Sequence, residues 1–139
     1  MEQFLNDFEF IYHAIIDSQY TLTEIVENEI PCDILLIEGS ITEDFKRADV
    51  SIVKIIENYS KRIKKVVTVG TCATFGGIFA ESGYDNTTGL HFTKEEKINR
   101  FESIKEKTIS ISGCPIHPEV LVNTLYAIKK GINLELDNY

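Results

Sequence analysis

Two cysteines follow apolar runs of the kind that form buried strands. Cys72 comes shortly after the run Val66–Val69, and Cys114 comes shortly after the run Thr108–Ser112. Short apolar runs rich in β-branched residues are typical of strands in a parallel sheet. Ligands bind beyond the carboxyl ends of such strands, and thiolates are the usual ligands of iron–sulfur clusters. The pair therefore predicts half of a metal-cluster site. Alone, either cysteine is better explained as a small buried apolar residue.

The third cysteine is expected to lie elsewhere. Cys32 precedes the apolar run Asp33–Gly39, and the strand between Cys32 and Gly39 spans about 20 Å at roughly 3.3 Å per residue. Cys32 is therefore predicted to lie at the opposite edge of the sheet, with a structural role. Glu38 ends the same run, so it should share the edge of the two thiols. There it either accepts backbone N–H bonds or faces a partner, or it is simply a solvated charge.

A nucleophilic site is the main alternative. Gly70–Thr74 could form a turn that exposes Cys72 as a nucleophile, with His117 as base and Glu119 orienting the imidazole. This would make the chain a cysteine hydrolase or a glutamine amidotransferase-like enzyme. Two observations disfavour it: Thr74 stands where such a turn needs a smaller residue, and Cys114 has no role in that chemistry. A third hypothesis, a binding module for FMN or a nucleotide, lacks a phosphate-binding loop after the first strand.

The rest of the sequence alternates predicted strands and helices. This order is typical of an α/β fold in which helices cover both faces of a parallel sheet. Strands are predicted at 8–13, 33–39, 66–69 and 108–112, and helices at 21–28, 48–63, 93–104 and 118–131. Capping boxes open two of these helices, at Thr21–Glu24 and Thr93–Glu96. The basic stretch Lys61–Lys65 would interact favourably with the carboxyl end of the helix at 48–63. The segment 76–92 is too long for a simple connection, so it is either a binding loop or a surface insertion.

Bulk properties limit the classes of function. The length of 139 residues predicts a single domain, 1–139. The net charge of −8 disfavours nucleic acid as a main partner. No apolar run is long enough to span a bilayer, and the acidic start does not resemble a signal peptide. With three cysteines, the chain suits a reducing compartment, and we expect a cytoplasmic location.

The two thiol motifs resemble those of a known family. Gly70–Gly77 and Gly113–Glu119 are similar to the two downstream cluster motifs of the [NiFe]-hydrogenase small subunit. The related cluster subunit of respiratory NADH dehydrogenase shares the thiols. Ile37–Gly39 resembles the Val-Glu-Gly strand end of the hydrogenase branch. The three motifs occur in the family's order, and the resemblance spans nearly the whole chain, from about Phe8 to the last helix.

This resemblance implies a fold, a cofactor and a partner. The fold would be a flavodoxin-like, doubly wound parallel sheet. Its proximal [4Fe–4S] cluster would exchange electrons with the nickel–iron centre of a large subunit. Cys72 and Cys114 would be two of the four ligands of that cluster. The residues implied to shape the surrounding loops, with Glu38 at the same edge, are Gly70, Thr71, Gly113 and Pro115.

The chain also departs from the family's pattern. A Cys-x-x-Cys segment after an amino-terminal strand normally supplies the first two ligands, and none precedes Phe8. We therefore interpret the chain as an amino-terminally shortened form, either natural or artificial, that lacks its first strand, an interior one, and the family's later domain. Two thiols cannot close a four-iron cluster, so the chain alone is expected to bind no stable [4Fe–4S] cluster and to be inactive. Unpaired strand edges beside an apolar gap would favour strand exchange or a homodimer.

Overall fold

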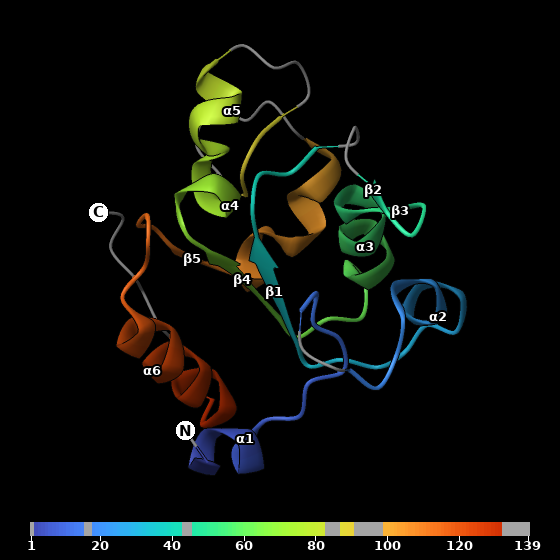
Figure 1. Ribbon diagram of the computed structural model, residues 1–139, viewed down its shortest axis with the longest axis vertical. Helices are drawn as coiled ribbons and strands as arrows, with labels where there is room; N and C mark the ends of the chain where they lie inside the picture. The colour runs from blue at the N-terminus through green and yellow to red at the C-terminus, as the bar shows by residue number, and fades with distance from the viewer. Residues whose placement is uncertain (1, 16–17, 43–45, 83–86, 91–98, 132–139) are drawn as a thin grey trace.

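A three-stranded parallel sheet forms the centre of the computed structural model, which describes residues 2–15, 18–42, 46–82, 87–90 and 99–131. The strand order is β1-β4-β5 (Figure 1). The bounds are Ile34–Glu38 for β1, Lys65–Val69 for β4 and Thr108–Ile111 for β5. A separate antiparallel pair joins β2 (Lys46–Arg47) to β3 (Val50–Ser51). The predicted class, an α/β fold with a parallel sheet, is confirmed.

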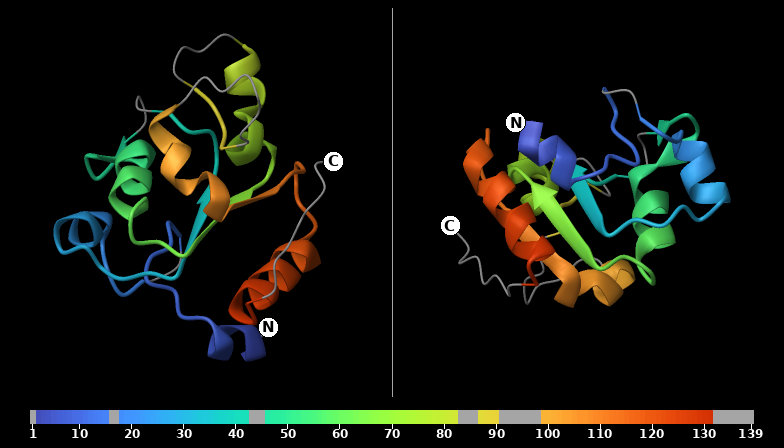
Figure 2. Two further views of the ribbon diagram at one scale, coloured as in Figure 1. Left: turned by 180° about the vertical axis from the view of Figure 1, so that it is seen from behind. Right: turned by 90° about the horizontal axis from the view of Figure 1, so that it is seen from below.

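Helices cover both faces of this sheet (Figure 2). One face carries α2 (Leu22–Glu27), α3 (Ile52–Tyr59) and the 3₁₀ helix η1 (Asn99–Lys107), and the other carries α6 (Pro118–Lys129), with α1 (Glu2–Asp7) beside it. Two short helices, α4 (Thr71–Phe75) and α5 (Gly77–Glu81), follow the carboxyl end of β4. None of the described helices is long and apolar enough to cross a membrane.

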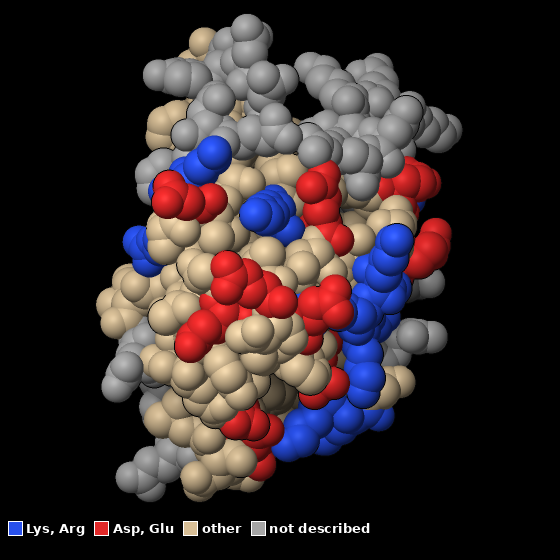
Figure 3. Space-filling model, turned by 90° about the vertical axis from the view of Figure 1, so that its right-hand side faces the viewer, with Lys and Arg blue, Asp and Glu red and all other residues tan. Residues whose placement is uncertain are grey.

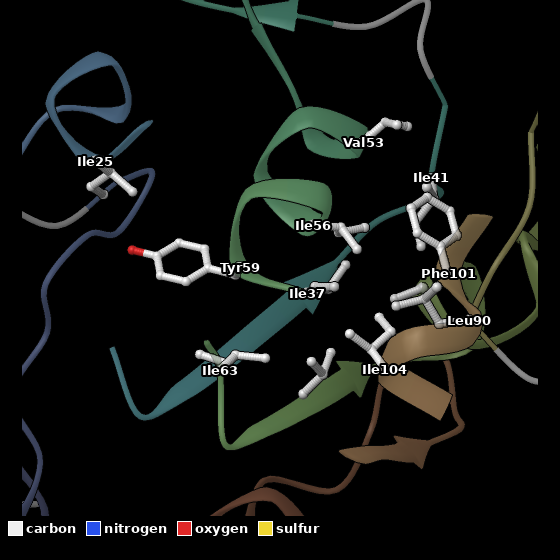
Figure 4. Packing of buried hydrophobic residues seen from close by; sticks show 12 residues of the cluster. Ile25, Ile37, Ile41, Val53, Ile56, Tyr59, Ile63, Leu90, Phe101 and Ile104 are labelled. Carbon is white, nitrogen blue, oxygen red and sulfur yellow. The ribbon is translucent and has the colours of Figure 1, made fainter. Parts of the chain in front are cut away.

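Neighbouring residues of the central strand serve two different cores. Val66 belongs to the larger core, where Ile37, Ile56 and Ile104 are also buried (Figure 4). Val67 belongs to the smaller core on the side of α6. Because successive side chains of a strand point to opposite faces, a strand covered on both sides reads as a continuous apolar run. This explains why the sequence shows no polar alternation there.

Several predicted helix ends are confirmed. Thr21 caps α2: the Glu24 N–H donates to Thr21 Oγ1 at 3.2 Å, and the Thr21 N–H donates to Glu24 Oε2 at 2.8 Å. Pro118 lies in the first turn of α6, as predicted. The second predicted capping box, at 93–96, and the start of the helix predicted at 93–104 lie outside the described residues.

The strand predicted at Phe8–His13 is wrong. These residues form no described strand, so the main sheet has three described strands and not four. The Phe8 ring instead lies 4.9 Å from the Phe4 ring and 5.2 Å from the Tyr126 ring of α6. Aromatic and β-branched residues favour half-buried surfaces in general, and here helix packing provides that surface.

The long helix predicted at 48–63 is wrong at both ends. Ala48 and Asp49 have positive φ angles, 50° and 62°, in the turn between β2 and β3. The helix begins only after Ser51, whose Oγ accepts the Lys54 N–H at 3.2 Å. It ends at Tyr59, so the basic stretch lies beyond it. The guanidinium of Arg62 stacks over the Tyr59 ring, 4.0 Å from its centroid, and the expected dipole interaction is absent from the described last turn.

The apolar gap expected from the loss of an interior strand stays a prediction, because in a doubly wound sheet the missing first strand would lie on the side of β1 away from β4. β1 pairs directly with β4 over its whole length, from Ile34 opposite Lys65 to Glu38 opposite Val69. The outer strands of the described sheet are therefore β1 and β5. Leu36 on β1 remains 38% exposed, so this edge is not fully covered.

Candidate functional site

The register of β4 and β5 places Cys72 and Cys114 at equivalent positions. The last residue pair of the two strands is Val69 opposite Ile111. Each cysteine lies three residues beyond its strand end, since 72 − 69 and 114 − 111 are both 3. The two cysteines thus follow the carboxyl ends of neighbouring parallel strands (Figure 1). The prediction that they share one edge of the sheet is confirmed.

Three hydrogen bonds tie the two cysteine loops together. The Thr71 N–H donates to the Gly113 carbonyl at 3.0 Å, and the Gly113 N–H donates to Thr71 Oγ1 at 3.2 Å. The Gly70 N–H donates to the Ile111 carbonyl at 2.7 Å. This reciprocal bonding holds the backbone just before Cys72 against the backbone just before Cys114.

Glycine is required where these loops approach each other. Gly70 has a φ of 91°, and a Cβ there would lie 3.3 Å from the Gly113 carbonyl oxygen. Gly113 has a φ of 134°. Residues with a side chain rarely adopt either backbone conformation. The Cys114–Pro115 peptide bond is cis.

The Cys72 sulfur lies in a space left by glycine. Cys72 is in the first turn of α4, and a Cβ at Gly77 would come within 2.6 Å of its Sγ. All three cysteines are free; Cys72 is half-buried and Cys114 is exposed. Neither of the two cysteines at this edge is fully buried.

The segment 87–90 packs against α4. The Leu90 N–H donates to the Ala73 carbonyl at 2.8 Å, and Leu90 is buried. Thr88 exchanges two backbone hydrogen bonds with Ile41, at 2.8 and 3.0 Å. The Ser40 hydroxyl donates to the Gly76 carbonyl at 2.7 Å. The described part of the 76–92 connection is therefore an integral support of α4, and its predicted role as a binding loop stays a prediction.

The remaining predicted residues lie around this edge without joining the thiols. Glu38 is the exposed last residue of β1, in register with Val69. His117 is the exposed amino cap of α6, and Glu119 is exposed in its first turn. Within the part of the chain that the structure describes, no hydrogen bond joins Cys72 to His117. The arrangement gives no support to the nucleophile–base pair of the hydrolase hypothesis.

Cys32 lies before β1, at the edge opposite the two thiols, as predicted. Its thiol donates to the Ile34 carbonyl at 3.0 Å and packs against the larger core. Burial raises the pKa of this thiol above its ordinary value of 9.0. A pocket beside it is lined by Glu29, Pro31, Cys32, Asp33, Arg62 and Lys64. Sequence reasoning did not find this pocket, because its lining comes from two segments, 29–33 and 62–64, that are far apart along the chain.

Charged side chains of both signs occupy the face beside α2 and α3. Acidic side chains lie across the middle of this face, and a strip of lysine and arginine follows one side (Figure 3). Asp33 and Lys64, which line the pocket, form an exposed ion pair at 3.2 Å. Such an exposed pair adds little to stability.

Two thiols do not complete the ligand set of a [4Fe–4S] cluster. Such a cluster takes four cysteine thiolates, and the third cysteine lies at the other edge of the sheet. No group of three or more His, Cys, Asp or Glu side chains suited to a metal ion occurs among the described residues. The described site therefore does not by itself fit the whole cluster.

Comparison with known proteins agrees with the arrangement of these motifs. Residues 1–128 match the family described as the NADH ubiquinone oxidoreductase 20 kDa subunit. The chain belongs to this family. Among its relatives, the periplasmic [NiFe] hydrogenase small subunit 1 of Nitratidesulfovibrio vulgaris is 31% identical over 112 residues, which cover 76% of this chain and 33% of the relative. An NADH-quinone oxidoreductase subunit of Campylobacter fetus is 34% identical over 103 residues, covering 74% of this chain and 51% of that relative.

The fold agrees with these family members. The crystal structure of the reduced Ni-Fe-Se hydrogenase from Desulfomicrobium baculatum matches with a TM-score of 0.69 and 21% identity, over 99% of this chain and 58% of that chain. The family match and the two relatives confirm the resemblance to hydrogenase small subunits and to the NADH dehydrogenase subunit. The chain spans between a third and about half of the length of the two curated relatives described above.

Proposed function

We propose that this chain is part of an iron–sulfur electron-transfer subunit of a hydrogenase-type oxidoreductase. In this role Cys72 and Cys114 supply two thiolates to a [4Fe–4S] cluster. The observation that carries the proposal is the matched position of the two cysteines, each three residues beyond one of two paired parallel strands. Membership of a family that includes relatives of both oxidoreductase types supports it.

The chain's own residues would present and orient these thiolates. Thr71, Gly70 and Gly113 fix the two loops against each other, and Gly77 leaves room for the Cys72 sulfur. A bound cluster would supply one-electron transfer. Because the described residues hold only two of the four ligands, we expect the chain alone to lack a stable four-iron cluster and to be inactive.

An apolar surface next to Cys72 suits contact with a large catalytic subunit. Phe75, Ile78 and Phe79 on α4 and α5 are 45%, 71% and 51% exposed. Adjacent exposed apolar side chains often mark an interaction surface. Ile78→Lys should therefore prevent copurification with a large subunit, whereas Leu5→Lys, at an exposed apolar site on α1, should not. If the chain self-associates and neither variant changes this self-association, a homodimer through the outer strands β1 and β5 is favoured instead.

We place the protein in the cytoplasm, where its three thiols would stay reduced.

Cobalt binding tests the proposed pair of ligands. Titration of the reduced chain with Co²⁺ under anaerobic conditions should give a thiolate-to-metal absorption band. Cys72→Ser and Cys114→Ser should each weaken this band, because each removes one of the two thiolates. Cys32→Ser is the matched control and should leave the band unchanged. An undiminished band in the Cys72 and Cys114 variants would refute the shared site.

Iron reconstitution tests the ligand count. Incubation with iron and sulfide should load far fewer than four irons per chain, because four thiolates are needed. Loading near four irons, with a visible charge-transfer band, would contradict the proposal that this chain provides only two ligands.

A further inference from the structure

Two fully buried hydroxyls lie beneath the candidate site. Thr68 on β4 is 0% exposed and Thr74 on α4 is 1% exposed. Their Oγ1 atoms are 3.0 Å apart, and Thr74 Oγ1 lies 3.5 Å from the Ile111 carbonyl oxygen on β5. The pair therefore connects the helix that carries Cys72 with both strands that lead to the thiols.

The chemistry of the three groups fixes the direction of these bonds. The Ile111 carbonyl can only accept, so the Thr74 hydroxyl donates to it. A hydroxyl has one hydrogen, so Thr74 then accepts from Thr68. The Ile111 carbonyl also accepts the Gly70 N–H at 2.7 Å. One carbonyl on the strand before Cys114 thus receives bonds from both the loop and the helix around Cys72.

The helix α4 depends on such external contacts for its orientation. It has five residues, and a helix this short is not stable by itself in water. A rotation of α4 would separate the Thr74 hydroxyl from its partners inside a dry environment, and an unpaired buried hydroxyl is costly. The hydrogen bonds from Leu90 and Ser40 are accepted by backbone carbonyls, those of Ala73 on α4 and of Gly76. The side chain of Thr74 therefore provides a link that they do not.

We propose that Thr74 is a positioning residue, which fixes the direction of Cys72 relative to Cys114 through the hydroxyl chain Thr68–Thr74–Ile111. This inference rests on the proposed function of the two cysteines as ligands of one cluster. A thiol pair held at a fixed separation meets its metal without reorganising, which is the usual role of residues behind metal ligands.

Thiol alkylation in the metal-free chain tests this role. Thr74→Val keeps the shape of the side chain and removes the hydroxyl, whereas Thr74→Ser keeps the hydroxyl. The rates of reaction of Cys72 and Cys32 with iodoacetamide are measured in the same sample by peptide mass spectrometry. Cys32 reports general opening of the fold, because it lies at the other edge of the sheet.

We expect Thr74→Val to change the ratio of the Cys72 rate to the Cys32 rate by about threefold or more, the size expected for losing one ordinary hydrogen bond. Thr74→Ser should restore the parental ratio. Thr124→Val is the matched control: Thr124 is also buried, but its hydroxyl donates to the Val120 carbonyl of its own helix, at 2.7 Å. The control should lower stability without changing the ratio.

Two results would overturn the proposal: an unchanged ratio in a folded Thr74→Val variant, or an equal change in the Thr124→Val control. If Thr74→Val does not fold, Thr68→Val tests the same link, because it removes the donor to Thr74 without altering α4. The cobalt titration of the parental chain is a separate test. An absent thiolate band contradicts the ligand role of the cysteines, while the alkylation ratio decides whether Thr74 positions Cys72.

Discussion

Replacing Gly89 by alanine should destabilise the protein through a clash with the backbone of α4. An added Cβ would lie 2.2 Å from the Thr74 carbonyl carbon and 2.3 Å from both the Thr74 oxygen and the Phe75 nitrogen. All three are backbone atoms, so rotating a side chain cannot relieve the contact. Unlike the other described glycines, Gly89 does not have a positive φ, so the effect would come from packing alone.

The expected loss follows from two opposing effects. Inserting a carbon into a packed site costs about 1–3 kcal/mol. Alanine also lowers the conformational entropy of the unfolded chain, which stabilises the folded state by about 0.4–1 kcal/mol. We therefore expect the free energy of unfolding to fall by about 1–2 kcal/mol. Urea denaturation followed by circular dichroism should show a lower midpoint with an unchanged slope.

A second glycine separates the clash from backbone strain. Gly131 has a φ of 73°, and a Cβ added there would have no other atom within 4 Å. Gly131→Ala should cost about 1–2 kcal/mol from the left-handed conformation, and Gly131→Asn should recover part of that loss. A Gly89→Ala variant as stable as the parent would refute the close packing of segment 87–90 on α4.

Three further predictions concern other parts of the chain. Thr21→Ala should lower the free energy of unfolding by about 1 kcal/mol in urea, because it removes the cap of α2. Stability should fall as pH rises above 9, because the unfolded chain releases the Cys32 proton before the folded chain does; burial raises the folded pKa above 9.0. Cys32→Ala should flatten this decline in denaturation curves at pH 8 to 10, and an unchanged slope would contradict it. Gly77→Ala should displace the Cys72 sulfur and change the ratio of the Cys72 alkylation rate to the Cys32 rate. The same ratio in the variant and the parent would show that the Cys72 sulfur does not need the space at Gly77.

The position of the two thiols could be predicted because it depends on local patterns. An apolar run followed by glycine and cysteine defines a strand end, and parallel strands in one sheet bring their carboxyl ends together. The opposite position of Cys32 followed from the same reasoning. The capping box at Thr21 was predictable because both of its bonds lie within four residues.

Features that depend on distant contacts could not be predicted in this way. Phe8 packs on Tyr126, which lies more than a hundred residues later in the sequence. The aromatic composition signalled burial but not the partner. The buried bond between Thr68 and Thr74 also left no signal, because threonine is common in strands for its shape alone.

The direct pairing of β1 with β4 shows a further limit. The sequence identified both strands, but their pairing follows from the doubly wound order that the resemblance implies and not from any local pattern. The turn at Ala48 and Asp49 was missed for a related reason. Apolar residues at helical spacing continued through a segment whose backbone reverses direction, and periodicity does not report such a reversal.

The equal three-residue step from each strand end to its cysteine has an evolutionary consequence. The strand register sets where the two cysteines lie along the strand direction, whatever the length of the chain that connects them. A single deletion between Val69 and Cys72 would instead shift one sulfur and leave the other in place. Natural variation in length should therefore be rare between each strand end and its cysteine, and between the two motifs it should spare the residues that support α4.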